Sequence, residues 1–311
     1  MNVEYLSLSA EQPTEKLEKP ASIPPASIPL ESLILDPFAN TRDSRFYYSS
    51  TSHQSAVTQL KDMLDDGNQG WGCLSSAPGL GKTQLRTVLY RSLDTNRYLG
   101  VSIENSLLDF DQLLLEIISQ ISGERAYSSD FPDRYSRLAE FKLLLTEQVV
   151  QSGRHLVLFL DEAQDLEKVT LDKLRNLSNI CAEQSNLMSI ILIGDARLDS
   201  TLRGLPALGQ RVAVRANLQP LDARQTGAYV EHRLHVAGSQ QSLPFGDADL
   251  QSLHRVSRGI PREINTILKQ AINFARLSSK GLSADSLHEA LNSRSSAAAG
   301  PSSEFQSLGM S

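Results

Sequence analysis

The chain has 311 residues, of which 40% are hydrophobic and 21% charged, and its formal net charge is −6. This composition excludes a disordered or fibrous protein, and the longest apolar run, residues 156–160, is far shorter than the roughly 20 residues of a membrane-spanning helix. The N-terminus lacks a basic stretch followed by an apolar one, so we expect no secretory signal and a cytoplasmic protein with reduced thiols at Cys73 and Cys181.

The chain begins with a Pro-rich segment, residues 1–35, which is predicted to be a disordered leader. Strand and helix patterns alternate from residue 36 to residue 221, and this alternation predicts a parallel sheet covered by helices. The expected strands are 71–75, 97–103, 156–160, 189–193 and 212–218. The expected helices are 52–64, 84–90, 107–121, 134–150 and 170–183.

A near match to a phosphate-binding loop follows the first expected strand, and it consists of Ser76, Ala77, Pro78, Gly79, Leu80, Gly81, Lys82 and Thr83. Backbone amides of such a loop cradle phosphates, Lys82 reaches the β and γ phosphates, and Thr83 coordinates Mg²⁺. Gln84 continues into a helix whose dipole favours the same negative charge. Ser76 stands where the consensus has glycine but removes no amide donor. We interpret it as a tolerated variant, so the loop predicts ATP binding more firmly than it predicts fast hydrolysis.

Two adjacent acids, Asp161 and Glu162, end the apolar strand 156–160. We expect Asp161 to hold Mg²⁺ and Glu162 to orient and deprotonate the water that attacks the γ phosphate. The alternative is a strand end whose acids face solvent. The strand and helices between the loop and the acids are typical of the additional-strand branch of P-loop ATPases.

Asp195 follows the strand 189–193, at a position where a polar residue senses the γ phosphate, but a turn-forming role explains an aspartate there equally well. Three arginines follow, Arg203, Arg211 and Arg215. We expect Arg211 to be an arginine finger that reaches the nucleotide of a neighbouring subunit, because it precedes a short strand at the end of the core.

From residue 222 the strand signal stops, and residues 222–294 are predicted to form a separate helical lid. Its expected helices are 222–236, 247–257, 261–277 and 284–291, followed by a flexible tail, residues 295–311. Pro261 begins the third of these helices and places Arg262 on its first turn, where we expect Arg262 to point at the nucleotide. Residues 197–280 hold twelve Lys and Arg against six Asp and Glu, so an anionic partner such as DNA would meet this region.

Several segments together resemble the AAA+ ATPases of the general secretion pathway protein A (ExeA) family over residues 36–292. They are Asp36-Pro37-Phe38, residues 43–48, Ser52-His53, residues 160–166, 174–179 and 218–221, and residues 259–265. The resemblance implies an α/β P-loop NTPase core of the AAA+ additional-strand type with a C-terminal all-helical lid. It also implies ATP hydrolysis and a ring or filament of subunits. Two residues depart from the family pattern. Ser76 replaces the first glycine of the loop, and Asp195 stands where the family usually has glutamine.

The leading hypothesis is an AAA+ ATPase whose nucleotide-dependent assembly acts on a partner protein. One alternative is a DNA-binding transposition regulator, which the basic region 197–280 favours and the negative overall charge opposes. The other is a nucleotide-gated switch with little hydrolysis, favoured by Ser76 and Asp195.

Overall fold

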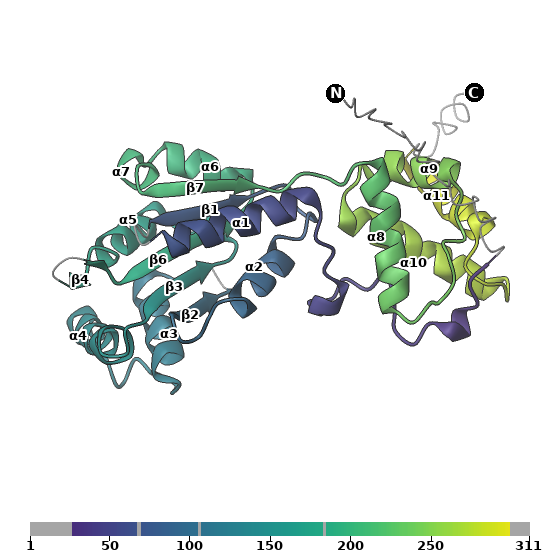
Figure 1. The fold of residues 1–311 in the computed structure, drawn as a ribbon. Coiled ribbons are helices and arrows are strands. Elements are labelled where there is room, and N and C mark those ends of the chain that lie inside the picture. The colour runs from purple at the N-terminus through teal and green to yellow at the C-terminus, as the bar shows by residue number, and fades with distance from the viewer. Residues whose placement is uncertain (1–26, 67–69, 105–106, 183–184, 299–311) are drawn as a thin grey trace, which may run out of the picture.

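A five-stranded parallel sheet forms the centre of the first part of the chain in the computed structural model, which describes residues 27–66, 70–104, 107–182 and 185–298 (Figure 1). The strand order is β2-β3-β6-β1-β7. The strands are β1 (Trp71–Ser75), β2 (Tyr98–Ile103), β3 (His155–Leu160), β6 (Met188–Gly194) and β7 (Val212–Asn217). Since β6 lies between β1 and β3, a further strand separates the loop-bearing strand from the acid-bearing strand. The predicted additional-strand P-loop fold is confirmed.

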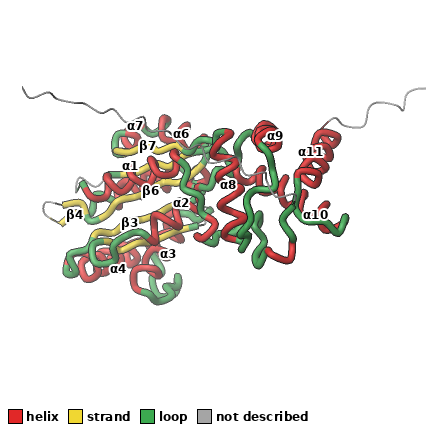
Figure 2. The backbone as a smooth tube through the Cα atoms, turned by 45° about the vertical axis from the view of Figure 1, so that its right-hand side comes forward, coloured by secondary structure: helices red, strands yellow, loops and turns green. Residues whose placement is uncertain are grey.

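Helices cover both faces of this sheet (Figure 2). The strands β1, β3 and β6 are buried throughout and have apolar side chains on each face, so both faces need such a cover. One face packs against α1 (Thr51–Asp65) and α2 (Lys82–Arg91). The other packs against a larger group of helices. Those helices are α3 (Phe110–Ser122), α4 (Arg134–Leu145) with the π-helical turn η3 (Thr146–Val150), α5 (Lys168–Leu177), α6 (Ala196–Arg203) and α7 (Pro206–Gly209).

The chain after β7 is helical and has its own apolar core. Its helices are α8 (Ala223–Val236), α9 (Asp247–Ser257), α10 (Pro261–Leu277) and α11 (Ala284–Ala298). Asp222 caps α8 by accepting the N–H of Gln225, whose side chain bonds back to Asp222. Helix α11 runs past residue 291, where the helix was expected to end, and residues 299–311 of the predicted tail lie outside the described residues.

The predicted leader was wrong for residues 27–35, and its remaining residues lie outside the described part of the chain. Ile28 is fully buried in the helical core and pairs with Leu282 through two backbone hydrogen bonds of 2.8 Å. Ile34 donates its backbone N–H to the carbonyl of Ala237 at 2.8 Å. The prolines indicated an unpacked segment, but Ile28 lies between them and its buried side chain holds residues 27–35 on the helices.

The helix predicted over 170–183 ends at Leu177, so Cys181 does not lie in a helix. Ser178 follows as the C-cap residue, where its hydroxyl donates to the Arg175 carbonyl and accepts from the Trp71 indole N–H. A short antiparallel pair follows, β4 (Cys181–Ala182) with β5 (Ser185–Asn186). Cys73 is a buried free thiol in β1, and burial raises its pKa to about 12, so it is an inert core residue.

None of the helices in the described ranges is both long and apolar enough to cross a bilayer.

Candidate nucleotide-binding site

The phosphate-binding loop connects β1 to α2 and depends on two glycines. Gly79 and Gly81 have φ values of +85° and +95°, in the left-handed region that L side chains adopt at a cost. Ser76 is outside that region, its side chain is buried, and its N–H donates to the Gly194 carbonyl at 3.2 Å. The consensus glycine is therefore not required by the backbone at Ser76, and the serine leaves the loop amides in place.

Lys82 and Thr83 begin α2 beneath the loop. The Lys82 ammonium is buried and donates to the carbonyls of Ser76 at 2.9 Å and Ala77 at 3.5 Å. Burial lowers the pKa of Lys82, and Glu162, Asp195 and Asp161 act in the opposite direction. The cation thus lies on the loop, next to three carboxylates that supply negative charge around it.

The two adjacent acids occupy different environments. Asp161 is buried, and burial raises its pKa while the Arg86 guanidinium, 3.4 Å away, and the Thr83 hydroxyl lower it. Glu162 is exposed and has a φ of +52°, a left-handed conformation that is unfavourable for glutamate. Its N–H donates to the Asp161 carboxylate at 3.1 Å, and its carboxylate accepts from Gln164 at 2.9 Å. This turn buries one carboxylate and directs the other toward the cavity.

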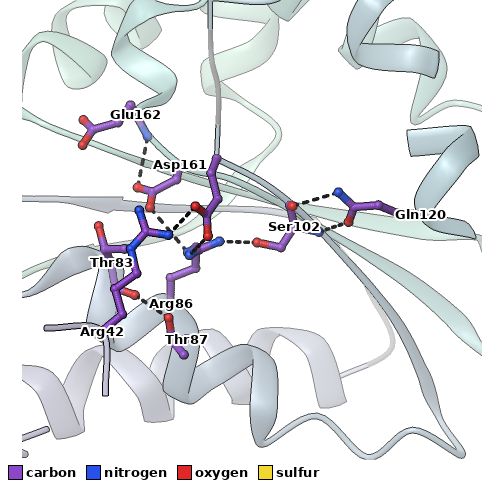
Figure 3. Close-up of polar contacts among 9 residues, drawn as sticks. Arg42, Thr83, Arg86, Thr87, Ser102, Gln120, Asp161 and Glu162 are labelled. Atoms are coloured by element: carbon purple, nitrogen blue, oxygen red, sulfur yellow. Dashed lines mark hydrogen bonds and ion pairs between the residues drawn. The ribbon is translucent and has the colours of Figure 1, made fainter. Parts of the chain in front are cut away.

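A chain of charges links Asp161 to the mouth of the site (Figure 3). Buried Arg86 pairs with Glu104 at 2.6 Å and also bonds the Ser102 hydroxyl, and Glu104 pairs in turn with Arg42, whose side chain is 67% exposed. Opposite charges alternate from Arg42 to Asp161, so each buried charge is compensated. Arg86 lies one helical turn after Lys82, and that spacing was the sequence signal that could have identified it.

Asp195 has a structural role at the start of α6. Its carboxylate accepts the N–H of Arg197 at 2.8 Å, capping the helix, and pairs with the Arg197 guanidinium at 2.9 Å. Hydrogen bonding from Arg197 lowers the pKa of Asp195 most. Arg197 also pairs with Asp165 at 3.1 Å. The position of Asp195 at the helix start agrees with the turn-forming interpretation. Asp195 also lines the cavity.

The helical part of the chain contacts the loop directly. The N–H of Arg262 donates to the Gly79 carbonyl at 3.3 Å, and a Cβ at Gly79 would lie 2.9 Å from the Arg262 Cβ and 3.0 Å from Ile260. Pro261 takes the first position of α10, as expected. Glycine at position 79 is therefore needed both for its φ value and for the approach of α10.

These groups enclose a cavity of about 400 Å³, within the size range of small-molecule sites. The predicted residues on its wall are Pro78, Gly79, Gly81, Lys82, Thr83, Gln84, Glu162, Asp195 and Arg262. The wall also has residues that the sequence did not reveal, namely Asn40, Thr41, Arg42, Tyr229, Arg233 and Asn265. They come from the N-terminal segment and from α8 and α10, and they lie together because of long-range packing.

Arg233 holds the N-terminal segment against α8. It is 2% exposed and donates to the carbonyls of Pro37 and Ala39, and its guanidinium lies 4.5 Å from the centre of the Phe46 ring. Burial lowers its pKa. Arg233 is one of the twelve cations counted in region 197–280, and its burial removes it from any surface that could bind DNA.

None of the three candidate finger arginines is on the wall of this cavity. The carbonyl of Arg211 accepts from the N–H of Trp71, at the start of β1, whereas the loop follows Ser75 at the other end. Five residues of strand separate the two ends by on the order of 13 Å. Arg215 pairs with Asp199 at 3.5 Å, and Arg203 donates to Ser200. Arg211 is absent from the wall of the cavity described above.

The site fits ATP and Mg²⁺ by the chemistry of its donors. The loop amides and the Lys82 ammonium suit phosphate oxygens, and the hydroxyl of Thr83 with the carboxylate of Asp161 provides the oxygen ligands that Mg²⁺ prefers. The Thr83 hydroxyl lowers the pKa of Asp161 through hydrogen bonding, so the two ligands lie within reach of one ion.

The family described as an AAA domain matches residues 65–202. General secretion pathway protein A of Aeromonas hydrophila is 34% identical over 254 residues, which is 78% of this chain and 44% of that protein. The ORC2 protein of Aeropyrum pernix has a TM-score of 0.64 at 16% identity, covering 82% of this chain and 71% of that one. Drosophila ORC bound to DNA has a TM-score of 0.55 at 19% identity, covering 92% and 70%. The two structural matches show likeness of fold alone.

The sheet order, the phosphate loop and the matched domain show that this chain has the P-loop fold of the AAA+ type. Within that class, the resemblance to the general secretion pathway protein A family is confirmed by the 34% identity. The chain spans 44% of the length of that relative.

Proposed function

We propose that this protein binds ATP with Mg²⁺ between its α/β core and its helical lid and hydrolyses it. The observation that carries the proposal is the meeting of the phosphate loop, Glu162 and Arg262 around one cavity. Mg²⁺ bound to Thr83 and Asp161 would neutralise phosphate charge. Glu162 would accept a proton from the attacking water, and its cavity-facing position supports this role.

Arg262 would couple the nucleotide to the lid. Its backbone bonds the loop at Gly79 while its exposed side chain lines the cavity, so a γ phosphate has a cation available from α10. Loss of that phosphate on hydrolysis would weaken the attraction between core and lid. This is the step by which ATP hydrolysis would change the lid position.

Self-association would complete the site. Arg211 lies at the sheet edge opposite its own loop, and we propose that it reaches the nucleotide of the next subunit as an arginine finger. Assembly into a ring or filament would then act on a partner protein, in line with the similarity to general secretion pathway protein A.

ATP binding and turnover by the purified chain test this function. Calorimetric titration and phosphate release are measured for wild type, Lys82→Ala and the control Lys142→Ala, which removes an exposed lysine of α4. Lys82→Ala is expected to lose both activities and Lys142→Ala to keep both. Light scattering with and without ATP measures assembly, and Arg211→Ala is expected to bind ATP but to lose turnover. Equal turnover in wild type and Arg211→Ala would exclude the finger.

A second candidate function is ATP-dependent DNA binding. Several lid arginines are exposed, including Arg224, Arg255 and Arg258, and they supply the positive surface that DNA requires. Titration of duplex DNA at increasing salt tests it, because phosphate contacts make affinity fall steeply with salt. Binding that needs ATP and weakens with salt would support this function, and no binding at low salt would exclude it.

A third candidate is a nucleotide-gated switch, which the pairing of Asp195 with Arg197 favours, since it leaves Asp195 less suited to sensing the γ phosphate. The ATP titration and the phosphate-release measurement of wild type decide between the switch and the ATPase. ATP binding without phosphate release in wild type would establish the switch, whereas turnover would exclude it.

A further inference from the structure

His53 of α1 lies directly behind the phosphate loop. Its side chain is 5% exposed, its Nε2 is 3.0 Å from the carbonyl oxygen of Leu80, and its Nδ1 is 2.7 Å from the Ser50 hydroxyl. A Cβ on Gly81 would lie 3.1 Å from Nε2. The imidazole therefore contacts the loop where its backbone turns through the left-handed conformation.

These contacts fix which nitrogen of His53 carries the proton. A carbonyl oxygen only accepts hydrogen bonds, so Nε2 must donate to Leu80. Nδ1 is then an acceptor and receives the Ser50 hydroxyl, and that hydroxyl oxygen in turn accepts the backbone N–H of His53 at 3.5 Å. Burial lowers the pKa of His53, with the Leu80 carbonyl opposing the shift. The ring is neutral at pH 7, with a defined tautomer.

The orientation of one loop amide follows from this contact. The Leu80 carbonyl and the Gly81 N–H belong to one trans peptide, in which the two groups point in opposite directions. Because the carbonyl is directed at His53, the Gly81 N–H points to the other side of the loop, and Gly81 lines the nucleotide cavity. Without a partner for the carbonyl, this peptide could rotate, since glycine tolerates the resulting φ values.

We propose that His53 is a positioning residue that holds the Leu80–Gly81 peptide with its N–H directed at the nucleotide phosphates. This inference rests on the proposed ATP site and assigns to it a residue from outside the loop. His53 does not touch the nucleotide, and its effect passes through the Leu80 carbonyl. Tyr47 packs edge-on against the ring of His53, with 5.7 Å between the two ring centroids.

Two variants separate this role from simple packing. The amide nitrogen of glutamine is as many bonds from Cβ as Nε2 of histidine, whereas the nitrogen of asparagine is one bond shorter. His53→Gln can therefore donate to Leu80, and His53→Asn cannot. One lost amide contact to a charged phosphate is expected to weaken ATP binding by roughly 10- to 100-fold in His53→Asn. His53→Gln is expected to stay within about threefold of wild type.

Equal ATP affinity in His53→Asn and wild type, or equal loss in both variants, would overturn the inference. Failure of wild type itself to bind ATP would instead overturn the proposed function. A second measurement needs no variant: nitrogen NMR of wild-type protein labelled with ¹⁵N-histidine. A protonated Nε2 and unprotonated Nδ1 at His53 are expected at pH 7, and the opposite tautomer would refute the positioning role.

Discussion

Substitution of Gly79 by alanine tests whether the lid must approach the loop for nucleotide binding. The φ value of +85° makes any L residue unfavourable there by about 1–2 kcal/mol. The new methyl group would also lie 2.9 Å from the Arg262 Cβ and 3.0 Å from the Ile260 Cγ2, and overpacking of this kind costs about 1–3 kcal/mol. The steric clash arises only while the start of α10 packs on the loop, which is the arrangement that encloses the cavity. The clash should therefore reduce ATP affinity by roughly 10- to 100-fold.

Gly123 provides a matched control. Its φ is +76°, and a Cβ there would meet no atom within 4 Å, so Gly123→Ala carries the backbone cost without a contact. Calorimetric titration with ATP and chemical unfolding are measured for both variants. Both should lose about 1–2 kcal/mol of unfolding free energy from the backbone term, and only Gly79→Ala should lose ATP affinity. Unchanged affinity in Gly79→Ala would refute the docked-lid geometry.

Three further predictions concern charge and the loop. Arg86→Met removes the cation that lowers the pKa of buried Asp161, so the acidic limit of ATP binding should move to higher pH, and an unmoved pH profile would contradict the pairing. Burial lowers the pKa of His155 to about 4, below an unfolded value near 6.5. The neutral ring therefore contributes to the free energy of unfolding above pH 6.5, and this contribution is lost as the pH falls from 6.5 toward 4. Unfolding free energy should therefore decrease by about 2 kcal/mol between pH 7 and pH 5, less so in His155→Gln, and equal pH dependence would exclude His155 as the source. Ser76→Gly should change ATP affinity by less than about threefold, because no left-handed φ is required there, and a large gain would show that the serine impairs the loop.

The parts of the site that the sequence predicted are those encoded in short runs of residues. Gly79, Gly81, Lys82 and Thr83 are consecutive or nearly so, and Asp161 with Glu162 ends a single apolar strand. Parallel pairing then brings the loop and the acids to one edge of the sheet, because the carboxyl ends of β1 and β3 lie on the same side. The strand–helix alternation predicted this topology.

The parts that were missed depend on contacts between distant residues. Arg233 bonds the carbonyl of Pro37, 196 residues away in sequence, and Ile28 pairs with Leu282. Neither pair has a local pattern, and the prolines around Ile28 indicated the opposite of packing. The end of α5 at Leu177 was also missed, and the next residue, Ser178, accepts a hydrogen bond from Trp71, which is 107 residues away in sequence.

The finger role of Arg211 stays a prediction, because it concerns a neighbouring subunit. Arg211 lies beside the start of β1, at the opposite end of that strand from the phosphate loop of its own chain. A finger at that position can act only between chains.

The most direct test of the central claim is a parallel measurement of ATP binding and phosphate release by Glu162→Gln. Glutamine keeps the size of the side chain at the cavity wall but cannot accept the proton of the attacking water. ATP affinity is expected to stay within about threefold of wild type while phosphate release falls by roughly 100-fold or more. Phosphate release at the wild-type rate, or loss of ATP binding together with turnover, would contradict the assignment of Glu162 and of the cavity around it.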